Sequence, residues 1–415
     1  MKVLISNKFY YPRGGDCIYA INLEQLLKQH GHETAVFAMQ HPENCCGSHC
    51  SLARTPWAKY FPSEVRFTPG RGLLRWWQQG LEAVFRPFGT REVKQKFHRL
   101  LDDFGPDVVH LNNIHSQLSP VIAQIAHERQ IKVVWTLHDY KLLCPRYDCR
   151  RNDREMCELC FTDKSNVLKY RCMKNSLFAS FIAWRESLKW SKEKLENFTD
   201  AFICPSRFMK EKMIQGGFQP DKLHTLCNFI DVNKTERDDY TKENYYCYVG
   251  RLSSEKGVKT LVEAAKQLPF PLKIVGTGPL WDELQQSSCD HIEFLGYKQW
   301  EEIKEVVGRA RFLVIPSEWY ENNPLTVIEA LCLGTPVLGA NIGGIPELID
   351  EEQTGLLFES RNVEDLKEKI ERIWEQCDPQ SFASTFDYQK IAKESQQRFS
   401  SDHYYNQLMN IYTSL

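Results

Sequence analysis

The sequence predicts an α/β protein made of two doubly wound, Rossmann-like domains. Two observations predict this fold class: short apolar runs alternate with helical patterns along the chain, and the alternation restarts after a polar stretch at 228–244. Strands that alternate with helices are typical of a parallel sheet covered by helices on both faces. A chain of 415 residues is long enough for two such domains.

The first half begins with a β-branched run, followed by a glycine loop and an apolar-periodic helix. The strands that we expect here are 1–6, 33–39, 107–113 and 132–139, and the helices are 17–32 and 118–130. Each strand is a short buried run, as the interior of a parallel sheet requires.

The second half repeats the same pattern and is followed by helices alone. The expected strands are 244–250, 271–278, 311–317 and 336–341, and the helices are 256–268, 300–310 and 325–334. The helical stretch from 387 onward has no strand after it, so we expect it to pack back on one half, with the first half as our choice. The predicted domains are 1–235, 236–385 and the helices of 386–415.

Composition narrows the class of protein. Charged residues make up 26% and hydrophobic residues 42% of the chain, and the net charge is −2, which gives no overall case for binding nucleic acid. The opening apolar run is too short for a signal peptide, and no run approaches the length of a membrane span. We therefore expect a cytoplasmic enzyme whose 15 cysteines are reduced.

Two cations follow the first strand of the second half. Arg251 and Lys256 lie in "VGRLSSEKGV", with Gly257 at the start of a helix. A strand end, two cations and a helix N-terminus are suited to a diphosphate; the alternative is a pair of solvated surface cations. Gly276 and Gly278 in "IVGTGPL" predict a tight turn that lets the backbone approach a base or ribose, and they do not form a dinucleotide fingerprint.

Two glutamates eight positions apart carry the strongest signal. Glu321 lies in the polar loop "YENNP" and Glu329 in the apolar helix "LTVIEALCLG". Eight residues are close to a whole number of turns, so we expect both carboxylates to face the same way. A carboxylate is a good acceptor for a ribose diol. The alternative for Glu329 is a helix carboxylate paired with an arginine elsewhere.

Residues 245–360 resemble the nucleotide-sugar half of the retaining GT-B glycosyltransferases of family 4. The resemblance rests on Arg251 and Lys256 in the "GR…K" pattern, on the glutamate pair and on "SEWYENNPLTVIEALCLGTPV". The first half resembles this family more loosely, through "YPRGGDCIYAINLEQLLKQHGHE" and "WTLHD". The resemblance implies the GT-B fold, in which the two domains face a central cleft where the nucleotide sugar binds.

The resemblance also implies roles for individual residues. Arg251 and Lys256 would hold the donor diphosphate, Glu329 the ribose and Glu321 the transferred sugar, while Gly15 would approach the phosphates from the other domain. His138 would line the reaction centre. The remaining donor contacts that we expect come from the loop and helix start at Asn322, Asn323 and Leu325.

The end of the strand 132–139 supports the assignment of His138, because this histidine directly follows an apolar run. A structural histidine is the alternative there. "VVHLNNIH" ends another strand, so we expect His110, Asn112 and His115 to contact the acceptor, which would be a glycan or a lipid-linked oligosaccharide.

The chain has no Asp-x-Asp motif for a catalytic metal. Fixed cations would then stabilise the departing diphosphate, and catalysis would need no cofactor. The resemblance implies retention of anomeric configuration, with UDP-sugars as the first donor class and GDP-mannose as the second. The alternatives are an epimerase or phosphorylase on the same scaffold and a nucleotide-sugar-binding module without activity.

One segment of the first half is basic and aromatic. Residues 54–99 hold ten Lys/Arg and three Glu, with Trp76, Trp77, Phe85 and Phe88 among them. Such a face suits peripheral contact with the anionic inner leaflet. The alternative is a solvated helix whose aromatic side chains belong to the core.

A cysteine-rich insertion at 144–172 follows His138. Its five cysteines include Cys157 and Cys160 in the C-x-x-C spacing. We predict a structural zinc held by Cys144, Cys157, Cys160 and Cys172, with Cys149 as a substitute ligand. The alternative is a set of free thiols in a loop.

Overall fold

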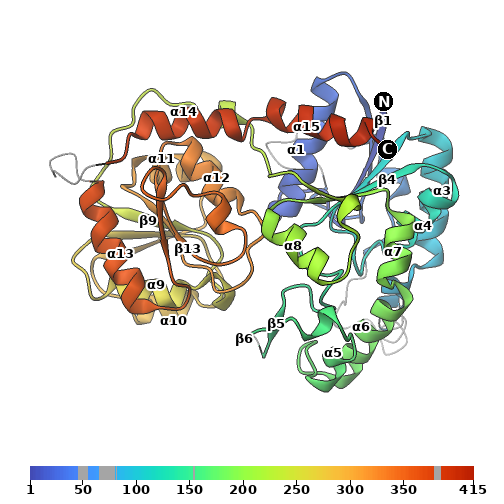
Figure 1. Ribbon diagram of the computed structural model, residues 1–415, viewed down its shortest axis with the longest axis horizontal. Helices are drawn as coiled ribbons and strands as arrows, with labels where there is room; N and C mark the ends of the chain where they lie inside the picture. The colour runs from blue at the N-terminus through green and yellow to red at the C-terminus, as the bar shows by residue number, and fades with distance from the viewer. Residues whose placement is uncertain (45–54, 65–79, 81, 153–154, 378–384) are drawn as a thin grey trace.

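The computed structural model describes residues 1–44, 55–64, 80, 82–152, 155–377 and 385–415. These residues form two α/β lobes, one on each side of the molecule (Figure 1). The first domain contains one six-stranded sheet, and the second domain contains another. The predicted fold class is confirmed.

The first sheet has the strand order β2-β1-β3-β4-β7-β8, and all of its pairs are parallel. Its central strands are buried apolar runs such as "KVLIS" and "KVVWT", because helices cover both faces. The strands are β1 (Lys2–Ser6), β2 (Glu33–Phe37), β3 (Val108–Leu111), β4 (Lys132–Thr136), β7 (Ala201–Cys204) and β8 (Leu223–Thr225). The helices are α1 (Gly15–Gln29), α3 (Arg91–Phe104), α4 (Val121–Glu128), α7 (Lys192–Phe198) and α8 (Arg207–Gln215).

The second sheet repeats this architecture in the order β11-β10-β9-β12-β13-β14, again with parallel pairs. Its strands are β9 (Tyr246–Val249), β10 (Leu272–Val275), β11 (Ile292–Gly296), β12 (Leu313–Ile315), β13 (Val337–Ala340) and β14 (Gly355–Phe358). The helices around it are α9 (Val258–Ala265), α10 (Trp281–Gln286), α11 (Trp300–Arg309), α12 (Leu325–Cys332) and α13 (Val363–Gln376). The edge strands β8, β11 and β14 and the interior strand β7 were not predicted from the sequence.

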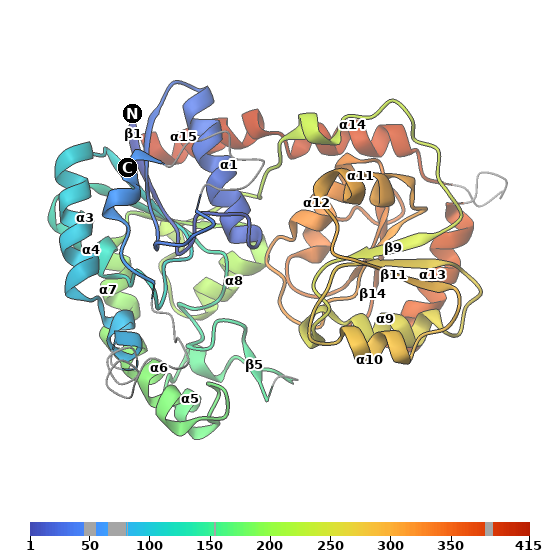
Figure 2. The same cartoon turned by 180° about the vertical axis from the view of Figure 1, so that it is seen from behind.

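The cysteine-rich insertion forms a small substructure below the first sheet (Figure 2). It contains the antiparallel pair β5 (Arg150–Arg151) and β6 (Glu155–Met156) and the helix α5 (Asn166–Lys169). The helix α6 (Leu177–Lys189) follows the insertion.

The two C-terminal helices join the domains. α14 (Tyr388–Arg398) packs on the second domain, where the Gln396 amide donates to the Cys332 carbonyl at 2.9 Å. α15 (Ser401–Thr413) returns to the first domain, where Tyr404, Leu408 and Ile411 are buried with β1 and α1. Both views show this helix pair running across the two lobes (Figures 1 and 2). The expected return to the first domain is therefore confirmed for α15 and wrong for α14.

The carboxyl ends of the two sheets face each other. The Asn322 amide, in the loop after β12, donates to the Leu137 carbonyl, directly after β4, at 2.7 Å. The Ser206 hydroxyl, after β7, bonds to the Asn322 side chain at 2.9 Å. Ligands of doubly wound folds bind at the carboxyl ends of the strands, so the functional site is expected between these two sheet edges.

In the described part of the chain, no helix combines the length and the apolar character that crossing a bilayer requires.

Candidate active site

The site in the second domain begins with a glycine that brings two loops together. Gly257 ends the turn that carries Lys256 and precedes α9, with φ 67°. A Cβ at this position would lie 1.7 Å from the Pro316 carbonyl oxygen. Only glycine fits both the left-handed backbone and this contact. The close approach brings Lys256 to the loop that holds Glu321.

Lys256 and Glu321 form an ion pair, with 2.6 Å between the ammonium and a carboxylate oxygen. The Ser317 hydroxyl donates to the same oxygen at 2.8 Å. Burial raises the pKa of Glu321, but Lys256 and the hydrogen bonds outweigh burial, so the net pKa lies below its ordinary value. Glu321 is therefore anionic at neutral pH although it is only 7% exposed. The Lys256 ammonium also lies 5.3 Å from the centre of the Trp319 ring.

Glu329 lies in the second turn of α12 and is half-buried. Its carboxylate has no hydrogen-bond or ion-pair partner among the described residues, so the arginine partner considered above is not found there. Burial raises the pKa of Glu329 to about 7, against a smaller opposing effect of Lys234. A half-buried carboxylate without a partner is an acceptor available to a ligand. Glu321 precedes α12, so helical periodicity does not relate the two glutamates as we expected.

Arg251 is the second cation of the predicted diphosphate site. It is exposed, and its guanidinium has no partner in the described chain. Leu325 is the first residue of α12, whose first-turn N–H groups lack intrahelical acceptors. Lys256 thus contacts Glu321, Arg251 belongs to the same loop as Lys256, and the N-terminus of α12 follows Glu321 by four residues. This combination favours a phosphate-bearing ligand.

The glycines of "IVGTG" serve the packing of loops. A Cβ on Gly276 would lie 1.9 Å from the Gly250 carbonyl oxygen, and one on Gly278 would lie 2.3 Å from that of Leu252. The close neighbour of each glycine is the backbone next to Arg251, and their expected approach to a base or ribose stays a prediction. The two glycines position the loop that carries Arg251 and Lys256.

Asn322 and Asn323 hold the domains together through their side chains. Besides the bonds of Asn322 to Leu137 and Ser206, the Asn323 side-chain oxygen accepts from the Asn228 N–H at 3.0 Å. Both asparagines are buried. The sequence assigned these residues to the donor through their backbone, and it missed the role of their side chains in the interface.

In the first domain, His138 follows β4, as predicted. Its Nε2 lies 3.0 Å from the Asn112 side-chain oxygen, and its ring packs edge-on against Tyr19 at 4.8 Å between centres. The Asn112 amide nitrogen donates to the Ser6 carbonyl. The Asn112 side-chain oxygen therefore faces the histidine and accepts a hydrogen bond from Nε2. Burial lowers the pKa of His138 to about 4, against an opposing effect of Asp16. His138 is thus neutral at pH 7 and keeps an unprotonated Nδ1.

The start of α1 lies beside His138. Gly15 is exposed, and a Cβ there would meet nothing within 4 Å, so there is open space over the helix N-terminus. Asp16, in the first turn, lies 3.6 Å from the Lys8 ammonium and interacts electrostatically with His138. Asp139 follows His138, and burial raises the pKa of its carboxyl to about 6. Lys8, Asp16 and Asp139 were not predicted from the sequence. Lys8 and Asp139 lie just after β1 and β4, and Asp16 lies in the first turn of α1, so their positions were the available signal.

The three residues expected to contact the acceptor have other partners. His110 is fully buried within β3, and its ring nitrogens bond to the Tyr412 hydroxyl at 2.5 Å and to the Thr136 hydroxyl at 2.7 Å. The expectation for His110 is wrong, because this histidine fixes α15 to the sheet. Asn112 is buried and orients His138. His115 is half-buried and stacks on Trp135 at 5.3 Å.

Three of the five cysteines of the insertion lie close together. The sulfur atoms of Cys149 and Cys160 lie within hydrogen-bond reach of Cys144, and these three residues are buried. Cys157 and Cys172 are half-buried. Over the described residues, no three or more His, Cys, Asp or Glu side chains are arranged so that they could hold a metal ion. The zinc site stays a prediction, and no step of the mechanism depends on it.

The insertion also contacts the second domain next to the site. The Glu158 carboxylate accepts from the Tyr320 hydroxyl at 2.9 Å and pairs with Lys212 at 2.6 Å. Tyr320 directly precedes Glu321. No motif indicated this contact, which spans 162 positions.

Comparisons with known proteins agree with this arrangement. Residues 13–234 match the profile of Glycosyltransferase Family 4, and residues 230–385 match that of Glycosyl transferases group 1. The chain is 25% identical over 360 residues to an uncharacterized 42.6 kDa protein in the cps region of Klebsiella pneumoniae, covering 84% of this chain and 87% of that protein. It is 30% identical over 176 residues to an uncharacterized glycosyltransferase of Methanocaldococcus jannaschii, covering 41% of this chain and about half (49%) of that relative.

Among solved structures, HepE of Anabaena in complex with UDP and glucose superposes with a TM-score of 0.67 at 18% identity, over 100% of both chains. This likeness shows the fold. The two profile matches show that the chain belongs to glycosyltransferase family 4, and it has the two-domain GT-B fold of HepE.

Proposed function

We propose that the chain is a retaining hexosyltransferase that moves a sugar from a nucleotide-sugar donor to a glycan or lipid-linked acceptor in cell-surface polysaccharide synthesis. UDP-sugars are the first donor class and GDP-mannose the second. The observation that carries the proposal is the half-buried carboxylate of Glu329, which has no partner among the described residues, eight positions after the ion-paired Glu321. The cps region of the Klebsiella relative and the UDP and glucose bound to HepE support the pathway and the donor.

The second domain binds the donor in this proposal. Glu329 accepts hydrogen bonds from the two ribose hydroxyls, and Glu321 accepts from hydroxyls of the transferred sugar. Arg251 and Lys256 contact the diphosphate. The Lys256 ammonium has three N–H donors, so it can pair with Glu321 and still donate to a phosphate oxygen.

The chemical step breaks the bond between the anomeric carbon and the diphosphate oxygen. The acceptor hydroxyl oxygen forms its new bond to that carbon on the same face, and its proton passes to the departing phosphate. Negative charge grows on the diphosphate as it leaves, and Arg251 and Lys256 stabilise this charge without a metal cofactor. Cations fixed before the reaction stabilise the transition state without reorganisation.

His138 orients the transferred sugar from the first domain. Asn112 holds the proton of the ring on Nε2, which leaves Nδ1 as an acceptor for a sugar hydroxyl. With a pKa of about 4, the ring is neutral and keeps this lone pair at neutral pH. Gly15 leaves open space at the N-terminus of α1, where the donor phosphates or the acceptor approach.

The test is a turnover assay with product analysis. The protein is incubated with UDP-glucose, UDP-galactose, UDP-N-acetylglucosamine and GDP-mannose, each with and without diphosphate-linked polyprenyl glycans. We expect release of the nucleoside diphosphate that depends on the acceptor, with the anomeric configuration of the donor kept in the product. Conversion of the donor without an acceptor would support an epimerase instead, and binding without turnover would support a module that has lost activity.

A further inference from the structure

The outer face of α6 is apolar although it is exposed. Leu177, Phe178, Phe181 and Leu188 are 56%, 66%, 45% and 45% exposed. At about 100° per residue, their side chains project within an arc of about 100°. The opposite face holds the buried Ser180, Ala183 and Glu186. α6 therefore exposes an apolar face and buries small and polar side chains, the reverse of the usual surface helix, whose polar side chains face solvent.

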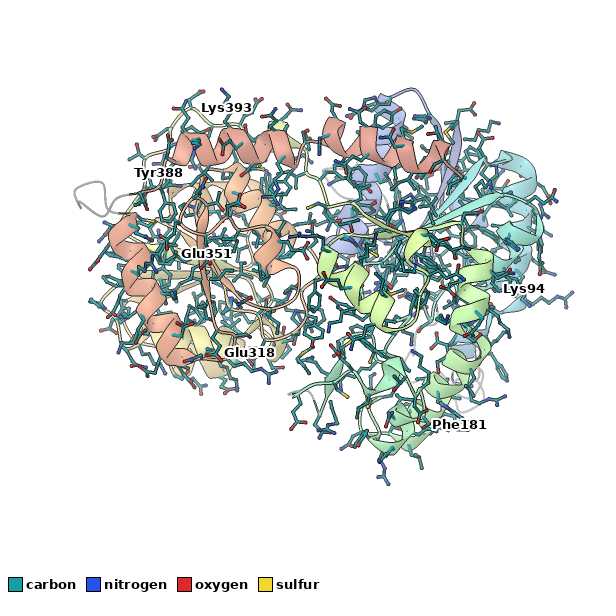
Figure 3. All side chains as sticks on the ribbon, viewed as in Figure 1. Lys94, Phe181, Glu318, Glu351, Tyr388 and Lys393 are labelled. Carbon is teal, nitrogen blue, oxygen red and sulfur yellow. The ribbon has the colours of Figure 1, made fainter. Side chains whose placement is uncertain are left out.

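The clustering of exposed apolar side chains on α6 is unusual within the described part of the molecule. Of the eleven exposed large apolar residues in the described chain, four lie on this one helix. Figure 3 shows Phe181 at the lower right of the molecule, far from the second domain. Single exposed apolar residues are normal on a protein surface, but a contiguous group marks a contact with another phase or molecule.

The exposed charges of residues 164–189 are all positive. Lys169, Arg171, Lys174 and Arg185 are exposed on α5, α6 and the turn between them. Residues 164–189 contain six Lys/Arg and one acidic residue, Glu186. Glu186 is buried and paired with Lys141 at 2.9 Å. The exposed surface of this segment is thus cationic in a chain whose net charge is −2.

Part of the basic segment 54–99 adjoins this face. The Lys189 ammonium, at the end of α6, donates to the Phe88 carbonyl, and Phe85 is 59% exposed. Trp76 and Trp77, on which the expected membrane contact also rested, lie outside the described residues. The described surface thus extends from α6 to Phe85.

We propose that this surface, made by α6 with Lys169, Arg171, Lys174 and Phe85, docks the protein on an anionic phospholipid bilayer. The aromatic and leucine side chains would enter the interface between headgroups and acyl chains. The Lys and Arg side chains would reach the headgroups with their charged ends and lie along the apolar surface with their stems. The net positive charge of residues 164–189, next to the exposed apolar side chains of α6, is complementary to anionic lipid.

The ion pair of Lys141 with Glu186 connects this surface to the loop after His138. Docking through α6 would hold the first domain, which carries His138, next to the membrane. If the acceptor is lipid-linked, as the proposed function has it, the acceptor and the enzyme would share the same surface. The docking itself does not depend on any catalytic activity.

The test is cosedimentation of the full chain with vesicles, a measurement that needs no donor or acceptor. The vesicles are phosphatidylcholine alone or phosphatidylcholine with phosphatidylglycerol, at low and at high salt. We expect binding only to the anionic vesicles, weaker by about tenfold or more in high salt. Phe178→Ser combined with Phe181→Ser should weaken this binding by about tenfold or more, and so should Arg171→Glu combined with Lys174→Glu.

Tyr297→Ser is the matched control, because Tyr297 is 71% exposed but lies on the second domain. It should bind as the unchanged protein does. All variants are first checked for an unchanged melting temperature, which is expected for exposed positions. Failure to bind anionic vesicles, equal binding by the double serine variant, or a dimer in sedimentation velocity that the serine variant abolishes would overturn the proposal.

Discussion

The Lys256 ammonium lies 2.6 Å from a carboxylate oxygen of Glu321, and the two residues come from loops at the ends of β9 and β12. The pair depends on Gly257, where any side chain would meet the Pro316 carbonyl. It places a cation next to the point where the sugar and the diphosphate of a donor would part.

Removing this cation should slow the reaction strongly. We predict that Lys256→Met lowers kcat/KM by roughly ten- to a hundredfold, since a lost charge contact costs about 1.5–3 kcal/mol. Lys259→Met, on the next turn, removes an exposed lysine that pairs with Glu283, and it should leave the rate unchanged. Equal rates for Lys256→Met and Lys259→Met would contradict the assignment.

The raised pKa of Glu329 predicts how stability varies with pH. Its pKa is about 7 in the folded protein and 4.5 ordinarily, so the unfolded chain ionises first as the pH rises. Ionisation of Glu329 therefore lowers the free energy of unfolding. The effect grows as the pH rises from about 4.5 to 7 and is complete above that range. Glu329→Gln should be more stable than the unchanged protein at pH 8 by about 1–3 kcal/mol, allowing for partial exposure, and little different near pH 5.

The same substitution should weaken donor binding at pH 8. The unchanged protein should bind a UDP-sugar more tightly as the pH rises through about 7, because the ionised carboxylate is the better acceptor. Glu329→Gln should remove this dependence. Urea denaturation and calorimetry at pH 5 and pH 8 measure both effects, and a destabilised Glu329→Gln protein at pH 8 would show that the carboxylate has a structural partner.

Asn322 should affect stability more than donor affinity. Its side chain bonds to the Leu137 carbonyl and the Ser206 hydroxyl across the domain interface. Asn322→Ala leaves both groups without this partner, so we expect a loss of about 1–3 kcal/mol in the free energy of unfolding. Donor affinity, measured by calorimetry, should fall less than it does for Glu329→Gln. The opposite order would make Asn322 a donor ligand.

The zinc prediction is tested by elemental analysis of protein purified without chelator. A structural zinc predicts about one equivalent per chain, and a melting temperature that chelator lowers. Cys144→Ser should abolish both, whereas Cys289→Ser, outside the insertion, should change neither. Zinc well below one equivalent, with stability unaffected by chelator, would leave the cysteines as free thiols.

The sequence predicted those parts of the fold and site that depend on local pattern. Buried runs such as "KVLIS" identified central strands, and the loop after β12 identified Glu321. Edge strands such as β8 were missed, because "LHT" is not a buried apolar run and only its first residue is buried. The partners of a residue could not be predicted where they lie far along the chain.

His110 illustrates this limit. Its position at a strand end suggested an acceptor contact, but its ring bonds to Tyr412, 302 positions away on a helix that crosses between the domains. Alternation along β3 did not reveal which side chains α15 would cover. The role of the Asn322 side chain was missed for the same reason, since the Leu137 carbonyl that it binds belongs to the other domain.

The central claim is that a nucleotide sugar binds between Arg251, Lys256, Glu321 and Glu329. Titration calorimetry with UDP-glucose, GDP-mannose and ADP-glucose tests it most directly, with the unchanged protein beside Arg251→Met, Glu329→Gln and Lys259→Met. We predict that one donor binds with one-to-one stoichiometry, and that its affinity falls roughly ten- to a hundredfold in the first two variants and stays the same in the third. Binding of none of these donors, or equal binding to Glu329→Gln and the unchanged protein, would contradict the account.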